Sequence, residues 1–188
     1  MYLFGYGSLV NRNSFEQSLD GARIPPESGP FAARLNGWAA TWNVGSPSDR
    51  RPGYRWVDEE GQIFHGLLAF WGIEAGTDLY CYGAIYRINP DWLHNLDRRE
   101  GSYDRVDVTD SVECDQPFAG PVQTYVPKPE SVERLRLANP HNVVVRRSYI
   151  DVVREGFRTL GHEALDELHK RPAPPFRVAD LHLERIVS

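Results

Sequence analysis

MYLFGYGSLVNRNSF, residues 1–15, opens the chain and joins a short apolar run to two glycines and then to a helix-like segment. The apolar residues 2–4 predict a first strand. Asn11 or Asn13 is suited to cap the following helix, and Glu16 stands three residues after Asn13, as in a capping box. A glycine turn between a strand and a helix leaves unpaired N–H groups, which attract a carboxylate or an oxyanion. The stretch therefore predicts either an anion-binding turn or a plain tight turn.

Three familiar motifs fail in this stretch. A dinucleotide-binding GxGxxG motif needs a third glycine where Val10 stands. A P-loop needs Gly-Lys before Ser or Thr, and residues 1–15 contain no lysine. A nucleophile elbow needs glycines two residues on either side of its serine, where Ser8 has Tyr6 and Val10. These nucleotide-binding and serine-hydrolase interpretations are therefore excluded.

Length and composition indicate one ordinary domain with a packed core, because 41% of the 188 residues are hydrophobic. The net charge of −5 argues against a generic nucleic-acid binder, which is usually basic. No apolar run approaches the roughly 20 residues of a membrane-spanning helix, and no signal-peptide pattern opens the chain. We therefore expect a soluble cytoplasmic protein without nucleic-acid or membrane partners.

Cysteine and histidine form no metal-binding pattern. Cys81 and Cys114 each lie in a strand-like run outside any CxxC pair, so we expect two buried, reduced thiols. The six histidines are scattered, with neither HExxH nor HxH among them. We predict no metal site.

Strand signals recur along the chain and outnumber helical ones. Runs rich in aromatic and β-branched residues cover residues 2–4, 34–43, 62–70, 81–88, 103–112 and 121–126. Helices are predicted over 90–100, after an Asn89 cap, and over 148–161 and 162–169. Residues 44–61 carry Gly, Pro and charge, which predicts a loop or flap. The pattern predicts an α+β fold with a small, curled, mostly antiparallel or mixed sheet or barrel and helices packed outside.

The end of the chain is rich in proline. Pro172, Pro174 and Pro175 interrupt regular structure after the last predicted helix. We therefore expect residues 1–170 to form the domain and residues 171–188 to form a Pro-rich extension packed on it.

A second informative stretch is LDRREGSYDRVDV, residues 96–108, which places Glu100 at the predicted end of a helix. The negative end of the helix dipole raises the pKa of a carboxyl there, whereas arginines that face it lower that pKa. Residues 98 and 99 lie about 200° and 100° from residue 100 around a helix, so neither arginine need face the same way. Burial in a pocket would raise the pKa of Glu100 further and suit proton transfer near neutral pH. The plainer alternative is a surface glutamate in an Arg/Glu cluster.

Taken together, FGYGSL at 4–9 and LDRREG at 96–101, followed by Tyr103 and Arg105, resemble the γ-glutamylcyclotransferase-like superfamily. Softer matches lie in RL and GW at 34–35 and 37–38, in YGAIYRI at 82–88 and in TYV at 124–126. The resemblance covers about residues 2–165. Similarity to the glutathione-specific branch lies in residues 4–9, in Arg99-Glu100 and in the helix over 148–161. SDRRPG at 48–53 is similar to the S-x-x-H-R-G segment of that branch, but its histidine is missing. The LDxxEG form is typical of the general and γ-glutamylamine branches, so the leaving group stays open.

The resemblance implies an enzyme that converts a γ-glutamyl peptide or amine, with glutathione among the candidates, to 5-oxoproline and a free amine. The substrate's α-amino group attacks its own γ-carbonyl, and the resemblance implies that Glu100 serves as general base and then acid. It also implies a substrate-binding set of Tyr6, Gly7, Ser8, Leu9 and Tyr125. No cofactor or metal is implied, the partner is a small-molecule substrate, and a homodimer is one option.

Two alternatives stay open beside the cyclotransferase. One is a catalytically inactive small-molecule-binding protein, because a fold can outlive its activity. The other is a γ-glutamyl amide hydrolase, in which water replaces the internal amine. The products of the reaction distinguish all three.

Overall fold

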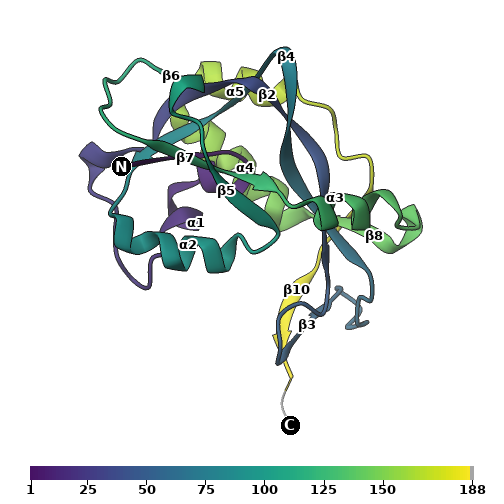
Figure 1. The fold of residues 1–188 in the computed structure, drawn as a ribbon. Helices are drawn as coiled ribbons and strands as arrows, with labels where there is room; N and C mark the ends of the chain where they lie inside the picture. The colour runs from purple at the N-terminus through teal and green to yellow at the C-terminus, as the bar shows by residue number, and fades with distance from the viewer. Residues whose placement is uncertain (187–188) are drawn as a thin grey trace.

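One eight-stranded sheet forms the framework of the computed structural model, which describes residues 1–186 (Figure 1). Its order is β5-β7-β1-β4-β2-β6, with β8 paired to β4 and β9 paired to β8. The strands are β1 (Tyr2–Gly5), β2 (Phe31–Pro47), β4 (Leu67–Arg87), β5 (Tyr103–Asp107), β6 (Val112–Cys114), β7 (Val122–Pro127), β8 (Val143–Arg146) and β9 (Arg177–Ala179). Since β1 runs antiparallel to β4 but parallel to β7, the sheet is mixed, as predicted.

The long hairpin of β2 and β4 is the spine of this sheet. Its pairing runs from Phe31 opposite Ile85 to Pro47 opposite Leu67, with irregularities at Asn36/Trp38 and Trp42/Val44. Bulges of this kind bend a strand and increase its twist, and Figure 1 shows the two ribbons winding around each other. One end of β4 therefore pairs with β1, while the other end pairs with β8.

Several predicted boundaries are wrong along this hairpin. Residues 44–61 are not one loop, because β2 continues to Pro47 and a further strand, β3 (Tyr54–Val57), pairs antiparallel with β10 (His182–Arg185). The predicted strands at 62–70 and 81–88 belong to the single strand β4, which begins only at Leu67. The predicted strand at 103–112 is divided by a 3₁₀ turn, η4 (Thr109–Ser111). Turn-type composition misled the prediction because long-range pairing overrides local preference.

Helices pack outside the sheet, as predicted. They are α1 (Arg12–Glu16), α2 (Leu93–Arg99), α3 (Pro129–Arg136), α4 (Arg147–Leu160) and α5 (His162–His169), with 3₁₀ turns η1 (Gly7–Val10), η2 (Pro26–Ser28), η3 (Pro90–Trp92) and η5 (Pro140–Asn142). The helix α3 was not predicted. In α4 the buried side chains Tyr149, Val153 and Phe157 lie on the predicted apolar face.

The helix α4 packs directly on the turn that follows β1. A Cβ atom at Gly156 would lie 2.6 Å from the amide nitrogen of Asn11 and 2.9 Å from the carbonyl carbon of Val10. Only glycine permits so close an approach between a helix and another backbone. This contact fixes the C-terminal end of η1 against α4.

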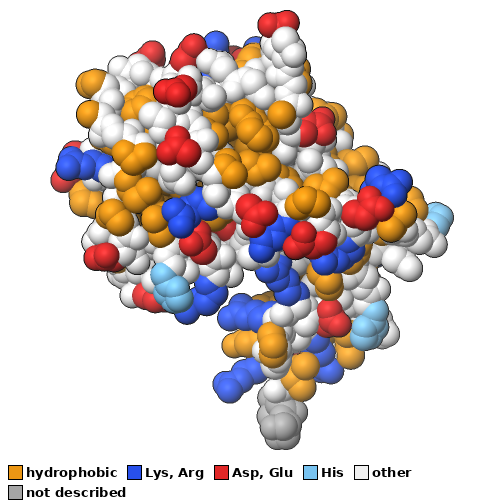
Figure 2. All heavy atoms as spheres, viewed as in Figure 1, with side chains coloured by type: hydrophobic (Ala, Val, Ile, Leu, Met, Phe, Trp, Pro, Cys, Tyr) orange, Lys and Arg blue, Asp and Glu red, His pale blue; other side chains and the backbone are white. Residues whose placement is uncertain are grey.

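The chain's last strands join two different sheets. The strand β9 extends the main sheet beside β8, whereas β10 pairs with β3 in a two-stranded ribbon that projects from the body (Figure 1). Basic side chains gather on this ribbon in Figure 2. Within the ribbon, Nε of Arg55 in β3 lies 2.7 Å from Oε2 of Glu184 in β10. The expected division of the chain at residue 170 stays a prediction. No helix within residues 1–186 is long and apolar enough to cross a membrane.

Asn11, not Asn13, caps α1, because its Oδ1 accepts a hydrogen bond of 2.9 Å from the amide of Ser14. The expected capping box is wrong, since the carboxylate of Glu16 accepts hydrogen bonds from Arg12 (3.0 Å), Arg23 (2.6 Å) and the amide of Ile24 (3.0 Å) instead. Burial pushes the pKa of Glu16 upward, but these hydrogen bonds outweigh it and lower that pKa. Glu16 thus ties α1 to the following loop.

We predict that Glu16→Gln lowers the free energy of unfolding at pH 7 by about 1–3 kcal/mol, because buried donors lose a charged acceptor. The pKa of Glu16 is lower in the folded than in the unfolded chain, where it is about 4.3. The stability that Glu16 adds to the wild type is therefore present above about pH 4.3 and is lost as the pH falls through the folded pKa. Urea unfolding at pH 7 and at about pH 3 measures this difference. The control is Glu163→Gln, which removes the exposed partner of Arg34. Equal losses in both variants would contradict the prediction.

Candidate active site

The glycine-rich motif begins at the end of β1 and continues into the turn η1. Gly7 adopts φ +56°, and the amide of Leu9 donates to the carbonyl of Tyr6 at 3.1 Å. The amides of Gly7 and Ser8 donate to no backbone or side-chain acceptor within residues 1–186. The amide of Leu9 is therefore engaged within the turn, whereas the amides of Gly7 and Ser8 have no acceptor within residues 1–186.

Arg99 connects this turn to the end of α2. Its Nη2 donates to Oγ of Ser8 at 3.1 Å and to Oγ of Ser14 at 2.9 Å. Its Nη1 donates to Oγ of Ser18 at 2.6 Å. Its Nε lies 3.0 Å from Oε1 of Glu100. One guanidinium therefore links the glycine turn, the region of α1 and the candidate general base.

Glu100 does not follow the helical spacing that the sequence suggested. The helix α2 ends at Arg99, and Glu100 adopts φ −85° and ψ 30° as its C-cap. Its side chain is only 13% exposed. Burial raises the pKa of Glu100, while the positive charges of Arg99 and Arg50 act in the opposite direction. Glu100 is therefore an enclosed carboxyl rather than a member of a surface Arg/Glu cluster.

Arg50 comes from the loop between β2 and β3 that the sequence predicted as a flap. Its Nη1 donates to Oγ of Ser102, and its guanidinium lies against Gly101. The side chain is exposed along most of its length, and its charge opposes the upward shift in the pKa of Glu100. This loop therefore contributes a second cation to the surroundings of the carboxyl.

Three tyrosines surround the same carboxyl. Burial raises the pKa of Tyr6, Tyr103 and Tyr149, and the negative charge of Glu100 adds to each shift. Their phenols are therefore neutral near pH 7 and remain hydrogen-bond donors. Tyr103 donates to the carbonyl of Trp71 at 2.7 Å, and the amide of Trp71 donates to Oη of Tyr149 at 3.2 Å.

Sequence reasoning missed most of this shell. Among the serine partners of Arg99, Ser8 belongs to the matched FGYGSL stretch, whereas Ser14 and Ser18 carry no motif. Tyr149 was expected only on the apolar face of the helix over 148–161. Tyr103 offered a signal, because it follows Glu100 by three residues in the matched segment. The contribution of Arg50 depends on the path of a loop, which local sequence does not determine.

The other expected substrate contacts are Tyr125, whose pKa is raised by burial first and also by the charge of Glu100, and Leu9. Tyr125 is 2% exposed, and its hydroxyl donates to Oδ1 of Asp97 at 2.8 Å. The carbonyl of Tyr125 accepts a bond of 2.7 Å from the hydroxyl of Tyr6. Leu9 is buried, and its carbonyl accepts from Tyr86 at 2.8 Å. Of the expected set, Ser8 is linked to Glu100 through Arg99, and the charge of Glu100 reaches both Tyr6 and Tyr125. Gly7 lies against the hydroxyl of Tyr149, and the backbone of Leu9 is engaged by Tyr6 and Tyr86.

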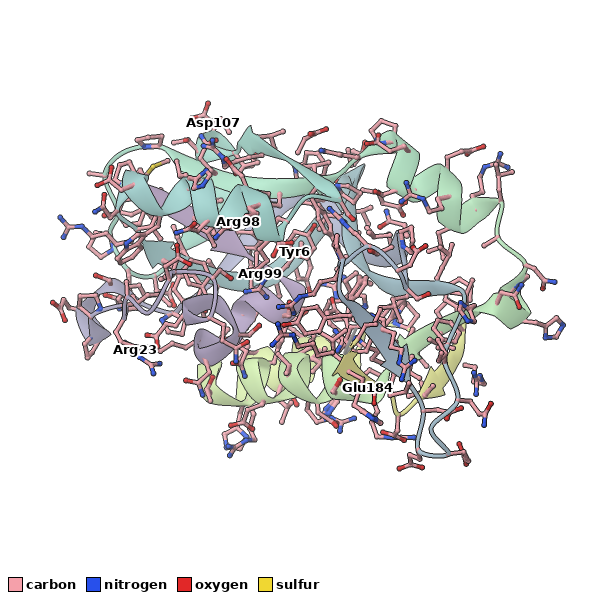
Figure 3. All side chains as sticks on the ribbon, turned by 90° about the horizontal axis from the view of Figure 1, so that it is seen from below. Tyr6, Arg23, Arg98, Arg99, Asp107 and Glu184 are labelled. Carbon is pink, nitrogen blue, oxygen red and sulfur yellow. The ribbon has the colours of Figure 1, made fainter. Side chains whose placement is uncertain are left out.

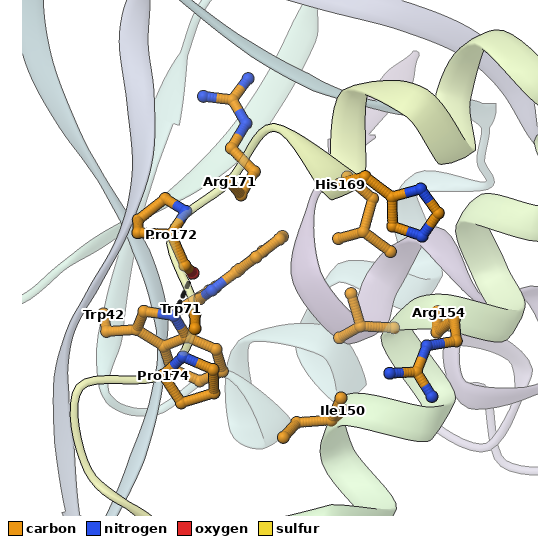
Figure 4. A pocket seen from close by; sticks show the side chains of 11 residues that line it. Trp42, Trp71, Ile150, Arg154, His169, Arg171, Pro172 and Pro174 are labelled. Atoms are coloured by element: carbon orange, nitrogen blue, oxygen red, sulfur yellow. Dashed lines mark hydrogen bonds between the residues drawn. The ribbon is translucent and has the colours of Figure 1, made fainter.

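A cavity lies close to this cluster but does not include it. About 290 Å³ in volume, it is lined by Trp42 and Trp71, α4, the end of α5 and the following segment (Figure 4). Neither Glu100 nor η1 lines it. Trp71 separates the two regions, since its side chain lines the cavity while its backbone bonds to Tyr103 and Tyr149. Figure 3 labels Tyr6 and Arg99 next to each other near the middle of the molecule.

No protein-family model and no curated protein matches the sequence. A solved structure named "Gamma-glutamyl cyclotransferase" matches with a TM-score of 0.55 at 16% identity, over 94% of this chain and 90% of that one. An uncharacterized protein from Homo sapiens matches with a TM-score of 0.55 at 16% identity, over 93% and 89%. YkqA from Bacillus subtilis matches with a TM-score of 0.55 at 20% identity, over 90% of this chain and 53% of YkqA.

These matches establish the fold. The chain has the γ-glutamylcyclotransferase-like fold, which confirms the fold that the sequence resemblance implied. At identities of 16–20% the likeness extends no further than the fold. The activity must therefore be argued from the site.

The burial of Glu100 predicts that its carboxylate opposes folding. The pKa of Glu100 is higher in the folded chain than in the unfolded chain, where it is about 4.3. As the pH rises, Glu100 therefore loses its proton first in the unfolded chain. The free energy of unfolding falls between about pH 4.3 and the folded pKa. We predict that Glu100→Gln is more stable than the wild type at about pH 8 and that this difference shrinks at about pH 4. Thermal unfolding at both pH values checks this. Exposed Glu130→Gln is the control, and a Glu100→Gln variant less stable at pH 8 would contradict the prediction.

Proposed function

We propose that this protein is a γ-glutamylcyclotransferase that releases 5-oxoproline from a γ-glutamyl peptide or amine. The observation that carries the proposal is the link between Glu100 and the glycine turn. An enclosed carboxyl with a raised pKa is connected through Arg99 to Ser8, beside two amides without an acceptor in residues 1–186. A proton-transfer group and an anion-binding turn are the two elements that this cyclisation needs.

Ring closure begins with proton removal. The ionised carboxylate of Glu100 takes a proton from the substrate's α-ammonium group, and the freed nitrogen attacks the γ-carbonyl carbon to form a five-membered ring. The upward shift in the pKa of Glu100 makes it a stronger base for this step than an exposed glutamate. The attack is intramolecular. Holding the glutamyl chain in a bent conformation therefore lowers the entropic part of the activation barrier by several kcal/mol.

Ring closure ends with loss of the amine. The bond between the γ-carbon and the leaving nitrogen breaks as Glu100 returns its proton to that nitrogen. The second proton of the ring nitrogen passes to the departing amine, which leaves as an ammonium ion, and Glu100 is again a carboxylate. The products are 5-oxoproline and a free amine, and no water is consumed. In this proposal the amides of Gly7 and Ser8 bind a negatively charged oxygen of the substrate. Neutral Tyr103 and Tyr149 add hydroxyls near the same carboxyl.

Product analysis tests the proposal. We predict that the wild type releases 5-oxoproline from at least one of glutathione, γ-glutamyl dipeptides and γ-glutamyl amines. We predict that Glu100→Gln reduces this release by at least about 10²-fold, the usual range for loss of a general acid–base group. Chromatography of 5-oxoproline and glutamate measures the outcome.

The alternatives give different products. Glutamate in place of 5-oxoproline would support the amide hydrolase, and neither product would support an inactive binding protein. Glu130→Gln, on the surface of α3, is the matched control and is expected to retain wild-type turnover. Full activity in a folded Glu100→Gln variant would overturn the assignment of Glu100.

A substitution in the turn tests the binding role of Gly7. A Cβ atom there would lie 2.8 Å from Oη of Tyr149, in a backbone with φ +56°. We predict that Gly7→Ala raises KM more than it lowers kcat, because the strained turn, costing about 1–2 kcal/mol, no longer presents its amides correctly. Gly21→Ala is matched for positive φ, at +87°, and has nothing within 4 Å.

The double variant Gly7→Ala/Tyr149→Phe separates the two causes. Removing the Tyr149 hydroxyl relieves the steric contact and leaves the backbone strain. If Gly7→Ala raises KM less in the Tyr149→Phe background than in the wild type, the steric contact causes part of the effect. An unchanged KM in Gly7→Ala would show that the turn is merely structural.

A further inference from the structure

The cavity beside Trp71 is a site that the proposed reaction does not use. It lies between the β2–β4 hairpin, the helices α4 and α5, and the segment that follows α5 (Figure 4). Its volume of about 290 Å³ is near the lower end of small-molecule sites, which span roughly 300–1,000 Å³. It therefore suits a ligand with one ring or two fused rings. The lining residues are Trp42, Trp71, Ile150, Val153, Arg154, Leu168, His169, Arg171, Pro172, Ala173 and Pro174.

The walls of this cavity are flat and apolar. The rings of Trp42 and Trp71 pack edge to face with their centroids 5.7 Å apart. The indole Nε1 of Trp42 is within 3.4 Å of the carbonyl of Pro172, which holds the proline-rich segment over the opening. Ile150 and Val153 of α4 form the opposite wall. Aromatic and proline faces with aliphatic side chains favour a planar aromatic ring.

The charged groups of the cavity all have one sign. Among the described residues its lining includes Arg154, His169 and Arg171 but neither Asp nor Glu. Arg154 has only a long, exposed contact of 3.5 Å with Asp151. Arg171 donates to the carbonyl of Tyr80 at 3.1 Å and lies over its ring, and its charge lowers the pKa of Glu167, which lies outside the cavity lining. Arginine stays charged at any physiological pH, and the rim therefore attracts an anion.

We propose that this cavity binds an aromatic monocarboxylate, with the ring between the tryptophans and α4 and the carboxylate at the basic rim. The proposal is independent of the cyclotransferase reaction, because it rests on lining residues that take no part in it. An apolar body with one negative group matches both the walls and the charge. A neutral aromatic ligand matches only the walls, and a cationic one is repelled by the rim.

Isothermal titration calorimetry with three probes of the same ring tests the charge requirement. The probes are indole-3-acetate, the neutral indole-3-acetamide and the cationic tryptamine, each titrated into the full chain up to millimolar concentration. We expect indole-3-acetate to bind most tightly and tryptamine least tightly. Equal affinities for the three probes, or no binding of indole-3-acetate, would overturn the proposal.

Variants then locate the binding. Arg154→Gln and Arg171→Gln are each expected to weaken indole-3-acetate by about two- to fivefold, the range of a partly exposed ion pair, and to leave indole-3-acetamide unchanged. Ile150→Trp fills the cavity and is expected to abolish binding of both probes. Arg158→Gln is the matched control, because Arg158 is on the same helix but pairs with Glu155 outside the cavity. Wild-type affinity in a folded Ile150→Trp variant would overturn the site.

Discussion

The guanidinium of Arg99 is the contact on which the arrangement of the candidate site depends. It reaches three serines that lie in or near the first two helical segments, and it also touches Glu100. A planar guanidinium carries five fixed donors on three nitrogen atoms and can bond all of these groups at once, whereas the single nitrogen of a lysine could not reach them all. Segments more than 80 residues apart in the chain thus meet at one side chain. Ser8 is therefore engaged in holding the site together and offers its amide, rather than its hydroxyl, to a ligand.

Glu100 is stabilised in position by a charge that also weakens it as a base. Burial raises the pKa of this carboxyl, and Arg99 and Arg50 pull that pKa back. Without a cation, an ionised carboxylate this enclosed would carry a large desolvation cost. With too many cations, it would hold protons too weakly to transfer them near neutral pH. The nearby tyrosines complete the balance, because they are polar but uncharged.

The sequence predicted the fold class and the helices at the end of the chain, because each has a strong local signal. The role of Glu100 came from the resemblance of two distant stretches taken together, and it stays a prediction. The alternation of apolar residues in strands and the apolar face of α4 can both be recognised in the local sequence, without knowledge of the rest of the chain. The prediction from sequence failed at residues 44–61, where β2 continues to Pro47 opposite Leu67 and β3 pairs with the distant β10. The partner of Pro47 lies 20 residues further along the chain and that of Val57 lies 125 residues further, and local composition reports neither pairing. The same reason hides Arg99: nothing in its neighbours reveals that three serines from the start of the chain surround it.

Trp71 relates the two parts of the interior that the structure keeps apart. Its backbone is held on one side by Tyr103 and on the other by Tyr149, both of which feel the charge of Glu100. Its indole forms a wall of the aromatic cavity. Because β4 is anchored here by two hydroxyl contacts, an occupant of the cavity would press on a residue that has little freedom to move independently of those tyrosines. Trp71 is therefore the residue at which the cavity and the surroundings of the carboxyl meet.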